Sequence, residues 1–258
     1  MTARKLAKKK GVEPIVMVTA YDYPTALIAD EAEVDAILVG DSLAMVVLGL
    51  ESTHGVSLGE MLHHIRAVAR AKPRALVVGD MPFGSYEPST RTAVESAIAM
   101  VRAGAEAVKL EGGSEYSDRV REIVKAGIPV MGHIGLTPQR YLRLGGYKKQ
   151  GKTKSDADRL LEDALALEDA GVFSIVIEYT VPGVAKTITE KVGVPTICIG
   201  SGPYCDGQVL VFHDIVGLSR NPPPFAKKYT DAYNILVEAI RAYADDVKNH
   251  RFPPKPSA

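Results

Sequence analysis

Seven short apolar runs, each followed by a stretch with helical signals, constrain the fold of this chain more than any other feature. Runs this short and this apolar are typical of parallel strands that are buried on both faces. Strand and helix signals alternate without a break in composition, which predicts one α/β domain with a parallel sheet. The expected strands are Ile15–Thr19, Ala36–Val39, Ala75–Gly79, Ala107–Leu110, Pro129–His133, Ser174–Ile177 and Pro195–Ile199.

The segments between the runs carry start and stop signals of helices. Ser57 and Glu60 form a capping box, and several of the expected helices are followed by a glycine that suits a helix C-terminus. The helices expected from these signals are His63–Ala71, Ser89–Ala103, Asp118–Ala126, Ser155–Ala170 and Thr230–Val247.

The length of 258 residues is close to the roughly 250 residues of a (β/α)₈ barrel. We therefore expect residues 1–258 to form a single (β/α)₈ TIM-barrel domain with a C-terminal helix and a short Pro-rich tail after Phe252. The eighth strand is the least clear element. Val209–Phe212 looks strand-like but begins too soon after the seventh strand for a crossover. A helix capped by Asp206 and ending at Gly217, with a last strand near Phe225–Lys228, is the expectation.

Composition and charge exclude several classes of protein. The chain is 46% hydrophobic and balances 31 Lys and Arg against 31 Asp and Glu, which excludes disorder and argues against a broad nucleic-acid surface. No apolar run approaches the roughly 18 residues of a membrane span, and no signal peptide is evident. Cys198 and Cys205 form neither a CxxC pair nor a disulfide framework, which fits a reducing cytoplasm. We expect a cytoplasmic protein without nucleic-acid or membrane partners.

Ionisable residues follow six successive strands, at the end where α/β barrels carry their chemistry. Asp41, Asp80 and Glu111 come from three adjacent strands and should converge at the barrel mouth. Three ionised carboxylates cannot share a small cleft without a cation or protonation. An all-oxygen set suits a hard divalent ion, and Mg²⁺ is the expected metal. The six residues are Asp22, Asp41, Asp80, Glu111, His133 and Glu178.

Three of the remaining positions have both a functional and a structural interpretation. Lys109 shares a strand face with Glu111, so it is either an anchor for an anionic substrate or an ion-pair partner. His133 is either a core histidine or a ligand contact, since flanking glycines leave backbone room for a ligand. Glu178, further round the mouth, is placed to act as a general base on a carbonyl compound bound to the metal. The alternative for Glu178 is an ion pair with Lys186 or a neighbouring Arg.

Two loops are further candidates. The basic, glycine-rich segment Leu142–Lys152 is either a mobile lid or a solvated surface loop. Gly200-Ser201-Gly202 follows the seventh strand, where many barrels bind phosphate, but three residues are too few to indicate a phosphate site.

Several stretches together resemble one family, ketopantoate hydroxymethyltransferase (3-methyl-2-oxobutanoate hydroxymethyltransferase). The similarity runs in order from about Gly11 to Gly217. The stretches are Val18–Tyr23, Leu38–Leu43, Val108–Gly113, Gly132–Gln139, Gly145–Lys148 and Asp206–Val211.

The resemblance implies a barrel of the phosphoenolpyruvate/pyruvate-like superfamily that condenses 3-methyl-2-oxobutanoate with 5,10-methylenetetrahydrofolate in pantothenate and coenzyme A synthesis. Asp41, Asp80 and Glu111 match the family's Mg²⁺ site, and Glu178 matches its proton acceptor. The resemblance also implies that the subunits assemble into a homo-oligomer, a large ring. The positions that match the family's oxoacid-binding residues are Asp41, Ser42, Asp80 and Lys109, with His133 at a pocket position.

Two alternatives and one departure accompany this interpretation. Another Mg²⁺-dependent barrel enzyme that forms an enolate, of the phosphoenolpyruvate mutase or isocitrate lyase kind, would usually carry a Cys in a mobile loop. A non-catalytic assembly homologue should have lost an active-site residue. After Glu178 the chain has Tyr179–Pro182, one residue longer than the family pattern, which leaves the shape of the nearby pocket open.

Overall fold

The computed structural model describes residues 1–254. The last four residues of the predicted Pro-rich tail, 255–258, lie outside the described residues. The chain divides into two compact units, residues 1–211 and residues 212–258, which are treated separately below.

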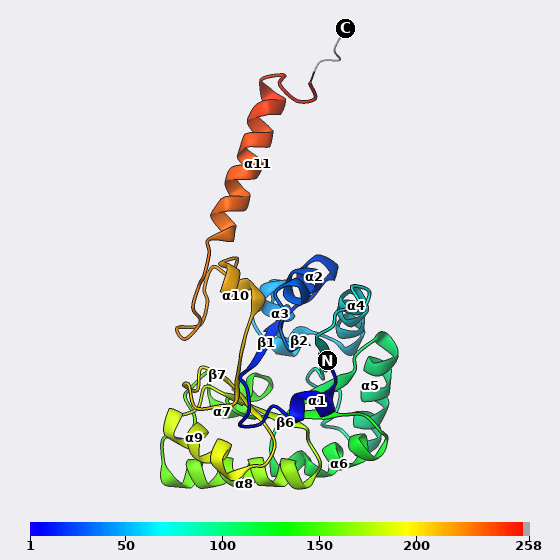
Figure 1. The fold of residues 1–258 in the computed structure, drawn as a ribbon, viewed down its shortest axis with the longest axis vertical. Coiled ribbons are helices and arrows are strands. Elements are labelled where there is room, and N and C mark those ends of the chain that lie inside the picture. The colour runs from blue at the N-terminus through cyan, green and yellow to red at the C-terminus, as the bar shows by residue number, and fades with distance from the viewer. Residues whose placement is uncertain (255–258) are drawn as a thin grey trace. The chain divides into compact units, whose positions relative to one another are not determined.

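The first unit is a closed barrel of parallel strands in which each strand pairs with its neighbours in sequence and β8 pairs with β1 (Figure 1). The strands are β1 Ile15–Thr19, β2 Ala36–Val39, β3 Leu76–Asp80, β4 Ala107–Glu111, β5 Val130–Gly135, β6 Ser174–Glu178, β7 Thr196–Ile199 and β8 Gly207–Leu210. The helices are α1 Ala3–Ala7, α2 Tyr23–Glu31, α3 Leu43–Val46, α4 Leu58–Ala69, α5 Thr90–Ala103, α6 Ser117–Lys125, α7 Tyr141–Leu144, α8 Lys154–Asp169 and α9 Pro182–Lys191. Short 3₁₀ turns are η1 Thr53–Gly55, η2 Ser114–Tyr116 and η3 Pro138–Arg140.

Apolar side chains of the strands fill the interior of the barrel. This core continues into α1, whose Ala3 and Leu6 are buried with it, so the N-terminal helix packs against the barrel core. Because side chains alternate along a strand, every second residue of each strand faces the interior. The strand residues of this core are Ile15, Met17, Ala36, Leu38, Leu76, Val78, Ala107, Met131, Val176, Ile197 and Val209.

Seven strands lie where the apolar runs predict them, within one or two residues. The local helix signals are confirmed as well. Ser57 and Glu60 form the reciprocal capping box at the start of α4. Ser89 caps α5, and Gly104 ends that helix with a φ of 114°, a value that favours glycine.

The prediction for the eighth strand is wrong. β8 lies at Gly207–Leu210 and pairs with both β1 and β7, so residues 200–206 return to the start of the barrel without a helix. Asp206 does not cap a helix. Its carboxylate accepts hydrogen bonds from the backbone N–H groups of Thr196 and Gly11 and thereby fixes the return segment to β7 and to the chain before β1. A Cβ on Gly207 would lie 2.5 Å from the carbonyl oxygen of Ile15, so this close strand approach requires glycine.

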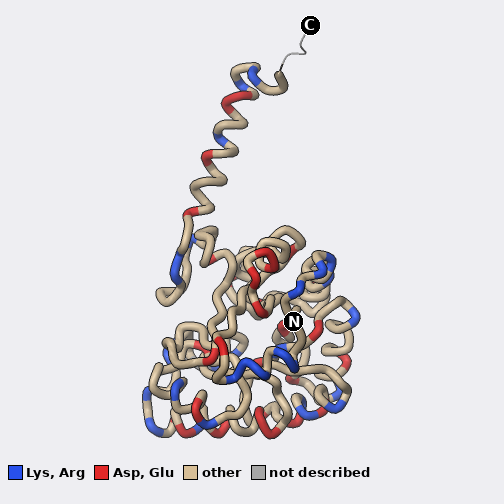
Figure 2. Tube along the Cα trace, viewed as in Figure 1, with Lys and Arg blue, Asp and Glu red and all other residues tan. Residues whose placement is uncertain are grey.

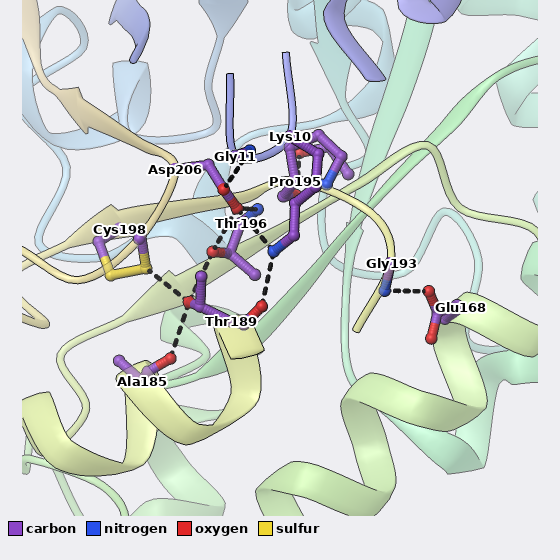
Figure 3. A network of polar contacts seen from close by, with 12 residues as sticks. Lys10, Gly11, Glu168, Ala185, Thr189, Gly193, Pro195, Thr196, Cys198 and Asp206 are labelled. Atoms are coloured by element: carbon purple, nitrogen blue, oxygen red, sulfur yellow. Dashed lines mark hydrogen bonds and ion pairs between the residues drawn. A yellow bond between two sulfur atoms is a disulfide. The ribbon is translucent and has the colours of Figure 1, made fainter. Parts of the chain in front are cut away.

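The expectation that Cys198 and Cys205 form no disulfide framework is also wrong, because Cys198 of β7 and Cys205 of the return segment form a disulfide. Figure 3 shows this bond beside Thr189, whose hydroxyl lies 2.7 Å from the hydroxyl of Thr196. Thr196 in turn contacts Asp206, which also pairs with Lys10. Two cysteines seven residues apart match no known disulfide motif. The fold of the barrel nevertheless brings the two thiols together, because the return segment runs alongside β7.

The second unit contains α10 Phe212–Val216 and α11 Ala232–Lys248. No residue of α11 is buried, and the helix exposes apolar side chains that include Ile235, Leu236 and Ile240. Acidic and basic positions are mixed along α11 and along the outer helices of the barrel (Figure 2). Among residues 1–254 no helix has the length and apolar character needed to cross a membrane.

Candidate active site

The inner faces of four adjacent strands change from apolar to ionisable as they approach their carboxyl ends. On β3, Val78 is followed on the same face by Asp80, and on β4, Ala107 is followed by Lys109 and then Glu111. On β5 and β6, His133 and Glu178 likewise succeed interior apolar residues. The same alternation that builds the core therefore places these five side chains above it. They form one polar cluster at the carboxyl ends of the strands, as α/β barrels place their chemistry.

Lys109 and Asp80 are partners in the register of β3 and β4 and form a buried ion pair of 2.6 Å between Nζ and Oδ1. The other oxygen of Asp80 accepts a hydrogen bond of 3.2 Å from the backbone N–H of Asp41. Burial opposes the charge on Lys109, but Asp80 and Glu111 outweigh it and raise the pKa of the ammonium group. Burial, Asp80 and Glu111 also raise the pKa of Asp41 well above its usual value.

His133 lies between two carboxylates. Its Nδ1 is 3.4 Å from Glu111 and its Nε2 is 3.2 Å from Glu178. Both distances fit ion pairs, although neither nitrogen makes a hydrogen bond of good geometry. Burial and Lys109 oppose protonation, but Glu111 and Glu178 outweigh them and raise the pKa of His133 to about 9. The imidazole is therefore cationic at neutral pH, and it links the carboxylates of β4 and β6.

Gln139 of η3 is a site residue that the sequence patterns did not identify. Its side-chain amide donates to Asp41 at 2.8 Å and to the carbonyl oxygen of Met81 at 2.9 Å. Its backbone N–H donates to Glu111 at 3.0 Å, and its side-chain oxygen accepts a hydrogen bond from the Tyr86 hydroxyl at 2.6 Å. Gln139 is the last residue of Gly132–Gln139, one of the stretches that resemble the family. Its place in that stretch is the sequence signal by which it could have been identified as a site residue.

Ser42 and the two glycines beside His133 all lie in close contact with other parts of the chain. The hydroxyl of Ser42 lies 2.8 Å from the hydroxyl of the buried Tyr21. The expectation that Gly132 and Gly135 make room for a ligand is wrong. A Cβ on Gly132 would meet Leu167 of α8, and one on Gly135 would lie 2.2 Å from the backbone oxygen of Glu178, so both glycines permit close packing of the chain itself.

The segment after Glu178 turns sharply out of β6. Tyr179 has a φ of 40°, a conformation that is uncommon for residues other than glycine. The next residue, Thr180, is fully buried, and its N–H donates to the hydroxyl of Ser201. Ser201 is also buried and donates to the carbonyl oxygen of Ile177, so it anchors this turn. Lys186, the predicted alternative partner of Glu178, instead lies 3.8 Å from Glu190.

The cluster suits a hard divalent cation bound by two carboxylates. Among residues 1–254, no three His, Cys, Asp and Glu side chains are grouped as ready metal ligands. The reason is visible in the contacts: Glu111 is held by Gln139 and lies against His133, whereas Asp41 and Asp80 are adjacent. Mg²⁺ is usually bound through one or two carboxylates, with water and substrate completing its shell. The raised pKa of Asp41 marks a buried carboxylate that a cation would relieve of its repulsion.

Comparisons with known proteins identify the family of this chain. The family model described as ketopantoate hydroxymethyltransferase matches residues 1–255. A relative from Aeropyrum pernix named 3-methyl-2-oxobutanoate hydroxymethyltransferase is 66% identical over 253 residues, which cover 98% of this chain and 92% of the relative. A relative of the same name from Ignicoccus hospitalis is 63% identical over 254 residues, covering 98% of this chain and 97% of the relative.

Solved structures confirm the predicted class of barrel. Phosphonopyruvate hydrolase in complex with oxalate and Mg²⁺ superposes with a TM-score of 0.64 at 14% identity, over 100% of this chain and 92% of that one. The 2,3-dimethylmalate lyase, a member of the PEP mutase/isocitrate lyase superfamily, superposes with a TM-score of 0.61 at 18% identity, over 98% of this chain and 89% of that one. These likenesses show the fold alone. The match of the family model along the chain and the identity to these relatives show that the chain belongs to the ketopantoate hydroxymethyltransferase family.

Proposed function

We propose that the protein transfers the one-carbon unit of 5,10-methylenetetrahydrofolate to 3-methyl-2-oxobutanoate and forms ketopantoate (2-dehydropantoate), a step of pantothenate and coenzyme A synthesis. One observation carries the proposal. The barrel mouth holds two adjacent carboxylates and a buried lysine, and Gln139, Glu111 and His133 connect them to a separate glutamate, Glu178. All of these contacts measure 2.6–3.4 Å. The names of the relatives support the same activity.

Each residue of the cluster has a role in this reaction. Asp41 and Asp80 would hold Mg²⁺, with Glu111 behind them. When bound there, the ion would supply Lewis-acid stabilisation of the negative charge that develops on the oxoacid. Lys109 and Ser42 bind the carboxylate of the oxoacid. Glu178 accepts the C3 proton, and the imidazolium of His133 holds the carboxylate of Glu178 in place.

The bonds and atoms of the transfer balance with water as the third reactant. The methylene carbon exchanges its two bonds to folate nitrogens for one bond to C3 of the oxoacid and one bond to the oxygen of water. The two folate nitrogens take up the C3 proton and a proton of that water. Tetrahydrofolate and the hydroxymethylated oxoacid leave.

The experiment is an assay of ketopantoate formation from the two substrates, with and without EDTA. We expect product only when Mg²⁺ is present. Glu178→Gln should abolish both product formation and the exchange of the C3 hydrogen with deuterated water, whereas Glu190→Gln, a change of an exposed glutamate on α9, should leave both unchanged. If Glu178→Gln exchanges the C3 hydrogen as fast as the native chain, Glu178 is not the base.

A lyase or mutase reaction of the superfamily kind has less support. Residues 136–154, which include the loop after β5, contain no cysteine, and the two cysteines of the chain are joined to each other. A binding subunit without activity has less support as well, because Asp41, Asp80, Lys109 and Glu178 are all present. Absence of ketopantoate formation in the assay above would favour these alternatives.

We also propose that the protein is a homo-oligomer. The apolar side chains of Ile235, Leu236 and Ile240 are each more than half exposed on α11, and contiguous exposed apolar residues often mark an interface. Native mass spectrometry should show an oligomer, and Ile240→Asp should reduce its mass. A monomeric native chain would contradict this proposal.

A further inference from the structure

A row of four aromatic rings lies at the carboxyl ends of the strands. The rings belong to Phe83, His54, Tyr141 and Tyr147, in that order. Successive ring centroids are 4.6, 4.9 and 5.8 Å apart, and the last two rings are nearly parallel, with an interplanar angle of 8°. These residues come from three separate connections of the barrel, so the row exists only in the folded chain.

The row is adjacent to the carboxylate cluster. The Nε2 atom of His54 lies 2.5 Å from the backbone oxygen of Gln139, the residue whose side chain contacts Asp41. At the other end of the row, burial is the largest cause that raises the pKa of Tyr147, and the charges of Glu178 and Asp41 add to it.

The two ends of the row are open to solvent. Phe83 is 49% exposed and Tyr147 is 48% exposed, whereas aromatic residues that serve a core, such as Tyr21 and Tyr86, are about 1% exposed. Large aromatic side chains that remain exposed beside an active site offer faces on which a flat ligand can stack.

A basic segment runs from the row to Glu178. Residues 140–154 carry six Lys and Arg side chains and no acidic residue. Within this segment the backbone N–H of Gln150 donates to Tyr179, and the backbone oxygen of Gln150 accepts from Val181. These bonds attach the segment to the turn that follows Glu178, and Lys149 lies over the ring of Tyr179 at 5.3 Å.

We propose that the aromatic row binds the planar heteroaromatic ring of the one-carbon donor by stacking, and that the basic segment binds the donor's anionic tail. This inference rests on the proposed function, in which the donor is a reduced folate with a bicyclic ring and a glutamate tail. Loss of one aromatic ring on which a nucleic-acid base stacks lowers affinity by about tenfold or more. A ring bound on this row lies near the cluster that activates the oxoacid, because His54 of the row contacts Gln139.

The test uses the full chain with Phe83→Leu and Tyr147→Leu, which remove a ring but keep an apolar side chain. Each variant should raise KM for methylenetetrahydrofolate by about tenfold or more, as the loss of one stacking contact implies. KM for the oxoacid should stay within twofold of the native value. Exchange of the C3 hydrogen with deuterated water, measured without folate, should also be unchanged, because that half-reaction needs no donor. Tyr147→Phe, which keeps the aromatic ring, should have the native KM for the donor.

The control is Tyr204→Leu, which removes a ring that is 50% exposed, lies beside Lys186 and is not part of the row. It should leave both KM values unchanged. Calorimetric titration with tetrahydrofolate should show the same pattern of affinities, and tetrahydropteroate, which lacks the glutamate tail, should bind the native chain less tightly. Native KM for the donor in both Leu variants, or an equal loss of C3 exchange, would overturn the inference. Failure of the native chain to form ketopantoate would instead overturn the proposed function.

Discussion

The side-chain amide of Gln139 donates a hydrogen bond of 2.8 Å to the carboxylate of Asp41. The same residue donates through its backbone to Glu111 and accepts a hydrogen bond from Tyr86. A single residue of η3 thus orients two of the three carboxylates that the sequence assigns to a metal site. Residues that orient ligands in this way affect metal affinity although they do not touch the metal.

Replacement of Gln139 with Leu should therefore weaken Mg²⁺ binding by about 10–100-fold. The reason is that Asp41 loses the donor that fixes its rotamer, while its charge is retained. Calorimetric titration of Mg²⁺ into the chain saturated with 3-methyl-2-oxobutanoate measures the change. Gln208→Leu makes the same substitution at an exposed position of β8 and should not alter the affinity. Native affinity in Gln139→Leu would show that Asp41 needs no such support.

The buried pair of Lys109 and Asp80 predicts a strongly non-additive effect on stability. Both side chains are almost fully inaccessible to solvent, so Lys109→Met leaves Asp80 without its cation and should lower the free energy of unfolding by about 3–5 kcal/mol. The double variant Lys109→Met, Asp80→Leu removes both charges and should recover most of that loss. Urea unfolding of the four chains of this cycle gives the coupling energy. Additive losses in the two single variants would mean that the pair contributes no coupling.

The sequence predicts the barrel well because each of its first seven strands is specified locally. Apolar β-branched runs, capping residues such as Ser57 and Ser89, and terminal glycines act within one element at a time. The carboxyl ends of those strands likewise identify Asp80, Lys109, Glu111, His133 and Glu178, since strand alternation carries their side chains to the same end of the barrel interior. Asp41 lies two residues beyond the end of β2, and its backbone N–H contacts Asp80.

The features that escaped prediction depend on contacts between distant segments. β8 follows β7 without a helix because Asp206 fixes the return segment to Thr196 and Gly11, bonds that no local pattern reveals. The disulfide depends on the same return path. A glutamine does not by itself indicate a catalytic or metal-binding site. Only the fold brings Gln139 to Asp41.

The disulfide between Cys198 and Cys205 should stabilise the barrel where the helix between β7 and β8 is missing. The two residues are seven apart in sequence, and closing a loop of that size in the unfolded chain corresponds to roughly 2–3 kcal/mol. The double variant Cys198→Ala, Cys205→Ser should show this loss in urea unfolding at neutral pH. Adding dithiothreitol should destabilise the native chain by a similar amount and leave the variant unaffected. A variant as stable as the oxidised native chain would contradict the prediction.

The contacts of Asp206 predict how stability depends on pH. Burial favours the neutral acid, but hydrogen bonds from Thr196 and Lys10 outweigh it and lower the pKa of Asp206 below its ordinary value of 3.8. A carboxyl group with a lowered pKa in the folded state stabilises the protein above its unfolded pKa, and this stabilisation is lost as the pH falls through the folded value.

Asp206→Asn should accordingly lower the free energy of unfolding by about 2 kcal/mol at pH 7, the range of hydrogen bonds to a charged group. The difference between the native chain and the variant should stay constant down to about pH 4 and shrink below it, as the native carboxylate becomes protonated. Urea unfolding at several pH values between 7 and 3 measures this difference. Asp158→Asn, a change of an exposed carboxylate on α8, provides the control and should have little effect at any pH. A difference that stays constant to pH 3 would show that ionised Asp206 does not hold the return segment against β7.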